Sequence, residues 1–314
     1  MNIYSAVIPL LLAIPAMAAD PFSTSPRLQE LLNQSVASTL EKFAPTNLRS
    51  NQLAVTLIDL RSSNQPARAS YRGDVQIYPA SVIKLFYLAA AHRWMEDGKL
   101  DETAELRRAM KDMIVESYNE ATHYIVDLLT GTTSGPELPE NELDVWFEKR
   151  NVVNRYYAGL GYANVVANKK PWCEGPYGRE SQSIKRQKPN RNMLTTDDTA
   201  RLLVEIVNLR CVTAKRSAEM LELMRRDPYK PLIDGGEPDQ GNAFTGLALR
   251  DLPGANLWSK AGWTSQVRHD AACIELSNGR RFVLVTFTEG HSNERGVIEA
   301  LGRAIVRDFS AARE

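Results

Sequence analysis

The stretch Tyr78-Pro79-Ala80-Ser81-Val82-Ile83-Lys84-Leu85-Phe86-Tyr87-Leu88-Ala89-Ala90-Ala91 decides how this chain folds. It predicts a helix that starts at Ser81, continues to Asp97 and stops at Gly98, since glycine is favoured just past a helix end. Apolar residues occupy almost every side of this helix, which leaves no polar face to turn toward water. Such a helix belongs in the middle of a protein, so we expect the other elements to surround it.

Hydrophobic patterns on both sides of this helix predict further elements. Strands are expected at 53–60, 67–71, 257–260, 268–276 and 281–288. The last two are joined by Asn278-Gly279, which is typical of a β-hairpin turn. Helices are expected at 27–43, 101–115, 117–130, 141–158, 196–209, 214–226 and 294–309. The stretch 161–194 is irregular and too long for a simple connector.

Strands near both chain ends with helices between them predict an α+β fold. We expect one antiparallel sheet built from the two ends, with a sheet lobe at about 27–78 and 245–314. A helical lobe at about 79–244 is inserted between these two parts. The cleft between two such lobes is a common place for an active site.

The composition is that of a globular protein, with 43% apolar and 24% charged residues. Lys plus Arg and Asp plus Glu are equal at 38 each, which gives no sign of a nucleic-acid or anionic-membrane partner. The three cysteines (Cys173, Cys211 and Cys273) form no C-x-x-C, and the four histidines show no ligand spacing. We therefore expect no metal site and no cofactor. One pair of cysteines can form a disulfide, and the odd count leaves a third thiol free.

The N-terminus has the pattern of an export signal. Residues 8–14 are nearly all apolar, and Ala16-Met17-Ala18 is a small-x-small cleavage site. The apolar run is too short to span a bilayer as a helix. We expect a signal peptide at 1–19, a catalytic domain at 20–314 without a membrane anchor, and a monomeric protein that is periplasmic or secreted.

Ser81-Val82-Ile83-Lys84 is the first candidate for chemistry. Lys84 lies one helical turn after Ser81 on the same face, where a neutral lysine can take the proton of a serine nucleophile. Burial and a second nearby cation both lower a lysine pKa. The alternative is that Ser81 only caps the helix.

Two more short segments carry candidate groups. Ser117-Tyr118-Asn119 stands at the start of a predicted helix, although Ser117 and Glu120 also fit a capping box. Lys260-Ala261-Gly262 follows a predicted strand, where a lysine is usually only solvated. Taken singly, each of these segments is a weak signal.

Taken together, the three segments resemble the S-x-x-K, S-D-N and K-T-G elements of the class A β-lactamases, in the same order and settings. The similarity extends over most of residues 27–310. Leu194-Thr195-Thr196 and the helix that follows resemble the end of the family's omega loop, and 260–288 resembles its closing strands.

This resemblance implies a set of roles. Ser81 attacks the substrate carbonyl after Lys84 takes its proton, and the backbone N–H groups of Ser81 and Trp263 form the oxyanion hole. Ser117 passes a proton to the leaving nitrogen, and Lys260 stabilises that transfer. Asn119, Ala261 and Gly262 complete the substrate contacts.

The chain departs from the family pattern at several positions. Tyr118 replaces the aspartate of the second motif, and Ala261 replaces a threonine hydroxyl for which Ser259 or Thr264 are candidate substitutes. Leu194 stands where an aspartate pins the omega loop. The glutamate that activates the deacylating water is expected to be Glu180, with Glu174 as the second candidate. The alternative for Glu180 is a solvated loop carboxylate without a catalytic role.

Three functions are compatible with these residues. The leading hypothesis is β-lactam hydrolysis through an acyl-enzyme. The altered omega loop and Ala261 favour a second, in which the substrate is a cell-wall peptide or another amide or ester. A third is a non-catalytic penicillin-binding module, although retention of Ser81, Lys84, Ser117 and Lys260 argues against a decayed site.

Overall fold

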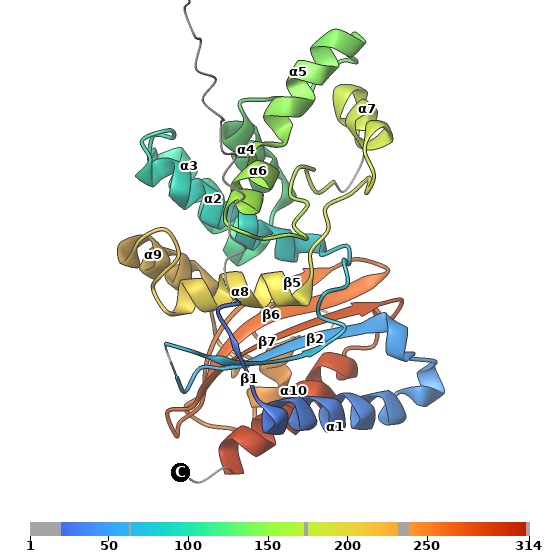
Figure 1. Ribbon diagram of the computed structural model, residues 1–314, viewed down its shortest axis with the longest axis vertical. Helices are drawn as coiled ribbons and strands as arrows, with labels where there is room; N and C mark the ends of the chain where they lie inside the picture. The colour runs from blue at the N-terminus through green and yellow to red at the C-terminus, as the bar shows by residue number, and fades with distance from the viewer. Residues whose placement is uncertain (1–19, 63, 173–174, 232–238, 312–314) are drawn as a thin grey trace, which may run out of the picture.

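The computed structural model describes residues 20–62, 64–172, 175–231 and 239–311 (Figure 1). The expected signal peptide, Cys173 and Glu174 lie outside the described residues. Within the described part, no helix is both long and apolar enough to cross a membrane. Cys211 and Cys273 are free and buried.

The described residues form one seven-stranded sheet, and six of its strands come from the two ends of the chain, as the strand pattern predicts. Its order is β1-β3-β2-β7-β6-β5-β4, and every pair is antiparallel except β1 with β3. The strands are β1 (Ser23–Thr24), β2 (Leu53–Asp59), β3 (Ala67–Tyr71), β4 (Arg225–Arg226), β5 (Asn256–Trp263), β6 (Val267–Glu275) and β7 (Arg281–Glu289). The exception is β4, which was expected to belong to the end of the helix 214–226 in the helical lobe. The pairing of β2 with β7 joins the N-terminal strands to the C-terminal ones, and the expected hairpin joins β6 to β7.

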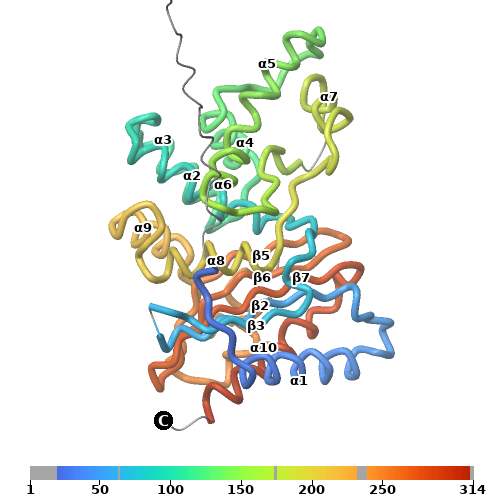
Figure 2. Tube along the Cα trace, viewed as in Figure 1, coloured from blue at the N-terminus to red at the C-terminus, as the bar shows by residue number. Residues whose placement is uncertain are grey.

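Helices cover both faces of this sheet (Figure 1). On one face, α1 (Pro26–Lys42) and α10 (Gly296–Ala311) pack side by side. Their apolar residues share a core with strand residues such as Leu57 and Leu284. On the other face, α8 (Thr196–Val207) lies between the sheet and the helical lobe, as Figure 2 also shows.

The helical lobe surrounds the helix with no polar face. Helix α2 (Lys84–Glu96) follows the short 3₁₀ turn η3 (Ala80–Ile83), and its side chains from Lys84 to His92 are all buried. The other helices of this lobe are α3 (Ala104–Lys111), α4 (Asn119–Thr130), α5 (Glu140–Arg150), α6 (Val152–Gly159), α7 (Gly178–Arg186) and α9 (Ala214–Met224). The predicted central position of this helix is therefore confirmed.

Several element boundaries differ from those expected. The predicted helix 141–158 is two helices that meet at Asn151, and β5 runs to Trp263 rather than to Lys260. Helix α7 lies inside the stretch 161–194 that shows no regular pattern. Its sequence is almost entirely polar, so no apolar periodicity announces it. Buried contacts of Glu180 and Ser183 hold it instead.

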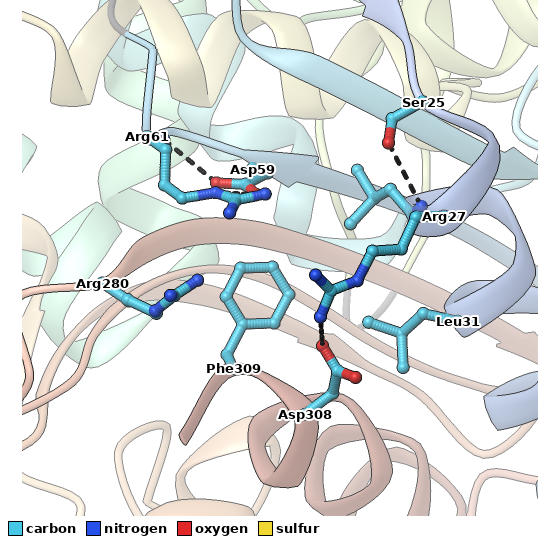
Figure 3. Close-up of a pocket in the computed structure, with 9 residues that line it drawn as sticks. Ser25, Arg27, Leu31, Asp59, Arg61, Arg280, Asp308 and Phe309 are labelled. Atoms are coloured by element: carbon cyan, nitrogen blue, oxygen red, sulfur yellow. Dashed lines mark hydrogen bonds and ion pairs between the residues drawn. The ribbon is translucent and has the colours of Figure 1, made fainter. Parts of the chain in front are cut away.

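Figure 3 shows a small pocket where the two ends of the chain meet, between α1, the end of β2 and α10. Arg27 pairs with Asp308 at 3.6 Å, and Arg61 pairs with Asp59 at 2.6 Å. The volume is about 20 Å³, which is room for one water molecule. The ion pairs therefore stabilise this part of the sheet lobe, and the pocket is too small to hold a substrate.

Leu32→Ala is expected to lower the free energy of unfolding by about 2–5 kcal/mol, because Leu32 is fully buried between α1 and the sheet. Urea denaturation measures this loss. The neighbouring Asn33→Ala, at an exposed position of the same helix, serves as the control and should change stability by less than about 0.5 kcal/mol. Equal effects of the two changes would contradict the packing of α1 on this sheet.

Candidate active site

The turn that presents Ser81 has an unusual backbone. Ala80 has a φ of 47°, in the left-handed region that residues with a side chain seldom adopt. Such a conformation costs about 1–3 kcal/mol and persists only where surrounding structure enforces it. Ser81 itself makes no side-chain capping bond at the start of η3 or α2, so the capping alternative for Ser81 is wrong.

Strand β5 presses against this turn at Gly262. A Cβ atom added to Gly262 would lie 2.5 Å from the Pro79 carbonyl oxygen and 3.1 Å from the Ser81 nitrogen. Only glycine allows the strand backbone to approach the nucleophile turn this closely. The structure thus places the third residue of Lys260-Ala261-Gly262 directly beside Ser81.

His269 fixes the turn from the next strand. It is paired with Gly262 across β5 and β6, and its Nε2 lies 2.9 Å from the Tyr78 carbonyl oxygen. Its Nδ1 accepts the backbone N–H of Thr288 at 3.1 Å, so Nε2 carries the proton and donates it to Tyr78. Burial lowers the pKa of His269 to about 4, which keeps the ring neutral at pH 7.

Lys84 reaches from α2 to the second motif. Its side chain is fully buried, and its Nζ donates to the Ser117 carbonyl oxygen at 2.5 Å and to Asn119 Oδ1 at 2.8 Å. The same Nζ lies 3.3 Å from Ser117 Oγ. Lys84, Ser117 and Asn119 are therefore gathered as the sequence predicts.

Ser117 is presented by a distorted turn rather than by a helix start. A single π-helical turn, Asp112–Glu116, precedes it, and its own φ is 61°. The N-cap of α4 is Tyr118, and no side chain caps that helix, so the capping-box alternative for Ser117 is wrong. This conformation lets both the carbonyl and the hydroxyl of Ser117 face Lys84.

Lys260 approaches Ser117 from the sheet. Its Nζ lies 2.9 Å from Ser117 Oγ, which places that hydroxyl between two buried lysines from different lobes. Burial, together with the charges of Lys84 and Arg226, holds the pKa of Lys260 well below its usual range, and Asp270 offsets part of this effect. Of the two lysines, one can thus serve as a base while the other remains the local cation.

Among the described residues, no strand pairs with the last residues of β5 on its cleft side. Strand β4 pairs only with Leu257 and Trp258. The Ala261 backbone N–H donates to Gln240 Oε1 at 3.2 Å, so it points out of this open edge. Because backbone direction repeats every two residues, the N–H of Trp263 points the same way, next to the Ser81 turn that Gly262 contacts.

The remaining side chains of this strand divide between the cleft and the core. Ala261 is buried in a small apolar cluster with Phe244 and Ile298, so only its backbone can meet a substrate. Ser259 is fully buried, whereas Thr264 is partly exposed and accepts the backbone N–H of Gln266. Of the two hydroxyls considered as replacements for a threonine at 261, only Thr264 lies at the surface.

Two exposed aromatic rings stand next to the motif residues. Tyr118 follows Ser117 and is 56% exposed, and Trp263 follows Gly262 and is 43% exposed. Both belong to segments whose polar atoms meet at Ser117 and Lys260. They give the rim of this site an apolar character.

Glu180 is not brought to this cluster. Its carboxylate contacts Arg150 at 2.6 Å, Ser134 at 2.9 Å and Lys170 at 3.6 Å. Lys170 and Arg150 also contact Asp127, which lies two turns along α4 from Asn119, or about 12 Å. The alternative expectation, a solvated loop carboxylate, is wrong, because Glu180 is only 2% exposed and lies in α7.

Sequence reasoning missed His269 and Gln240. Gln240 contacts Lys260 and Ala261, but it belongs to no motif and to no regular element. His269 lies in an apolar strand, where a histidine usually means no more than a satisfied core residue. Among the described residues, no group of three or more His, Cys, Asp or Glu side chains could hold a metal ion.

Comparison with known proteins identifies relatives of this arrangement. A model of the beta-lactamase enzyme family matches residues 35–309. A mutant of PBP-A, solved as an acyl-enzyme complex with penicillin G, is 18% identical with a TM-score of 0.64, over 93% of this chain and 100% of that chain. A beta-lactamase from Sphaerobacter thermophilus is 18% identical with a TM-score of 0.62, over 90% of this chain and 99% of that one.

The TLA-1 extended-spectrum beta-lactamase is also similar, at 14% identity and a TM-score of 0.63, over 90% of this chain and 99% of that one. At such identities these structures establish a shared fold, whereas the family model spans most of the sequence. No curated protein matches the chain.

Glu180→Gln is expected to lower the free energy of unfolding by about 3–5 kcal/mol, because it leaves Arg150 buried without its nearest carboxylate. Urea denaturation measures the loss. Glu148→Gln is the matched control, since Glu148 pairs with Arg155 at a site where its side chain is 76% exposed. Unchanged stability with arrested turnover of an acyl-enzyme would instead assign Glu180 to catalysis.

The pKa of His269 also predicts a loss of stability in acid. In the unfolded chain a histidine titrates near 6.5, whereas the folded protein holds His269 neutral down to about pH 4. The contribution is therefore complete above pH 6.5 and declines as the pH falls toward 4, by about 2 kcal/mol at pH 5. Urea denaturation at pH 7.5 and pH 5 should show a smaller decline for His269→Phe than for the parent protein.

Proposed function

Because the chain belongs to the beta-lactamase enzyme family, we propose that it is a serine hydrolase that opens the cyclic amide of β-lactams through an acyl-enzyme on Ser81. One observation supports this proposal more strongly than the others do. The Ser117 hydroxyl lies 2.9 Å from Lys260 Nζ and 3.3 Å from Lys84 Nζ. Lys84 follows Ser81 by one helical turn. This arrangement supports a base and a proton donor next to the turn that carries the proposed nucleophile.

In the acylation step, Lys84 removes the proton of Ser81 while the serine oxygen bonds to the lactam carbonyl carbon. The negative oxygen of the tetrahedral intermediate is stabilised by the backbone N–H groups of Ser81, whose nitrogen lies close to Gly262, and of Trp263, which follows Gly262 in the chain. The carbon–nitrogen bond then breaks. The nitrogen takes the proton of Ser117, which is replaced from the lysine pair that touches its hydroxyl.

Substrate binding uses the same cleft. Asn119 Oδ1 accepts from Lys84 at the edge of this cleft, and Asn119 is the residue proposed to contact the acylamide group of a substrate. Thr264 and the positive charge of Lys260 favour a substrate carboxylate at the open edge of β5. The rings of Tyr118 and Trp263 line the approach.

The contacts of Glu180 favour a second outcome for the acyl-enzyme. A carboxylate paired with Arg150 and Lys170 is a poor base for water, so deacylation is expected to be slow unless another group prepares the water. Slow deacylation is typical of a penicillin-binding protein or a cell-wall peptidase rather than of an antibiotic-hydrolysing enzyme. The apolar segment at 8–14 and the family support export to the periplasm or the medium for either role.

Intact-protein mass spectrometry after incubation with benzylpenicillin and with a chromogenic cephalosporin tests the proposal. We expect an adduct on the parent protein and none on Ser81→Ala, because only the serine oxygen forms the ester. Rapid colour development lost in Ser81→Ala would establish a β-lactamase and resistance activity. A persistent adduct without turnover would establish the penicillin-binding alternative, and the absence of both would overturn acylation by β-lactams.

A further inference from the structure

We propose that Gln240 is a positioning residue that holds Lys260 against the Ser117 hydroxyl and so fixes the direction in which Ser117 delivers its proton. The proposal rests on the proposed acylation of Ser81. Gln240 is half-buried and lies 20 positions before Lys260 in the chain, outside all three motifs.

The Gln240 amide joins the two lobes across the cleft. On the sheet side, Oε1 accepts from Lys260 Nζ at 2.6 Å and from the Ala261 backbone N–H at 3.2 Å. On the helical side, Nε2 donates to the carbonyl oxygens of Ile114 at 3.1 Å and Val115 at 2.8 Å. Those two carbonyls belong to the turn that ends at Ser117.

Its neighbours leave the amide a single orientation. An amide has two donors and a carbonyl with two lone pairs, and all four are used here. Rotating the amide by half a turn would place its NH₂ group against an ammonium and a backbone N–H, and its oxygen against two carbonyls. Gln240 therefore sets a fixed separation between the strand that carries Lys260 and the turn that carries Ser117.

This contact also decides which way hydrogen bonds run at Ser117. The ammonium of Lys260 has three N–H groups, and its three acceptors are Ser117 Oγ, Gln240 Oε1 and the Ala261 carbonyl oxygen at 2.8 Å. In the ammonium form every Lys260 hydrogen is donated, so Ser117 Oγ accepts from Lys260. The hydroxyl hydrogen of Ser117 is then directed away from Lys260, toward the cleft where a leaving nitrogen would stand.

The charge on Lys260 depends on a small set of neighbours. Among the described residues, the charged groups that act on it are Lys84 from α2, Arg226 from β4 and Asp270 from β6. Asp270 is the one carboxylate among them and lies on the other face of the strand, since it pairs with Ala261. The Gln240 carbonyl is thus the acceptor from the cleft side that favours the ammonium form of Lys260.

The test is the pH dependence of acylation of Ser81 by benzylpenicillin in two variants of the whole protein. Gln240→Met keeps the length of the side chain but removes its acceptor, so the pKa of Lys260 falls. The alkaline limb of the rate profile should move down by about one pH unit or more, and acylation at pH 7 should slow about tenfold. Gln240→Glu places a carboxylate beside the ammonium, so the alkaline limb of its rate profile should move to higher pH.

Shifts in opposite directions are the result expected from positioning, because a merely structural defect would slow both variants without moving the limbs. Asn242→Ala is the matched control. Asn242 lies in the same segment, and its side chain donates to the carbonyls of Lys230 and Pro231 rather than to Lys260 or Ala261, so its profile should match that of the parent protein. Unmoved limbs, or limbs that move in the same direction in both Gln240 variants, would overturn the proposal.

Lys260 can also be titrated without any substrate. In protein labelled with ¹³C-lysine, the Lys260 signal is identified by its loss in Lys260→Met, and its pKa is compared between the parent, Gln240→Met and Gln240→Glu. Opposite pKa changes support the role of Gln240 even if the parent protein is never acylated, in which case only the proposed function fails. An unchanged pKa in both variants overturns the role of Gln240 whatever the acylation result.

Discussion

Two buried lysines that share one serine hydroxyl are the constraint on which the structure depends. Removing an ammonium group from water is costly unless every donor finds an acceptor. Lys260 meets this need with three neutral oxygens, one each from Ser117, Gln240 and its own neighbour Ala261. Since these acceptors come from both sides of the cleft, the sheet lobe and the helical lobe must meet where the lysines lie.

The backbone around Ser81 is shaped by the sheet rather than by its own sequence. Ala80 adopts a conformation that is unfavourable for alanine, and it is kept there by contacts from two strands. Gly262 gives β5 room to reach the turn, and His269 on β6 binds the Tyr78 carbonyl. The strain is therefore balanced by packing, which holds the Ser81 backbone nitrogen close to Gly262 of β5.

A second buried charge system occupies the far part of the helical lobe and serves a different purpose. Glu180, Arg150, Lys170 and Asp127 tie α7, α5, the stretch before α7 and α4 together. The polar helix α7 has little apolar surface to bury, so these ion pairs and their hydrogen bonds hold it. Because this system lies apart from the two site lysines, its carboxylates do not lie beside Lys84. A carboxylate beside Lys84 would favour the charged form of that base.

The sequence by itself determined the central helix, most of the sheet built from both chain ends, and the motif residues Lys84, Ser117, Asn119 and Lys260 that the structure brings together. Those features depend on local periodicity and on motif order, which are written along the chain. Only the tertiary structure decided the burial of Glu180 among cations, the break at Asn151, and the contacts of His269 and Gln240. Each of these depends on contacts between segments far apart in the chain, such as Gln240 with Val115 or His269 with Tyr78. Hydrogen bonds of that range leave no periodic trace in a sequence, because a single polar side chain looks the same whether it meets water or a partner from another lobe.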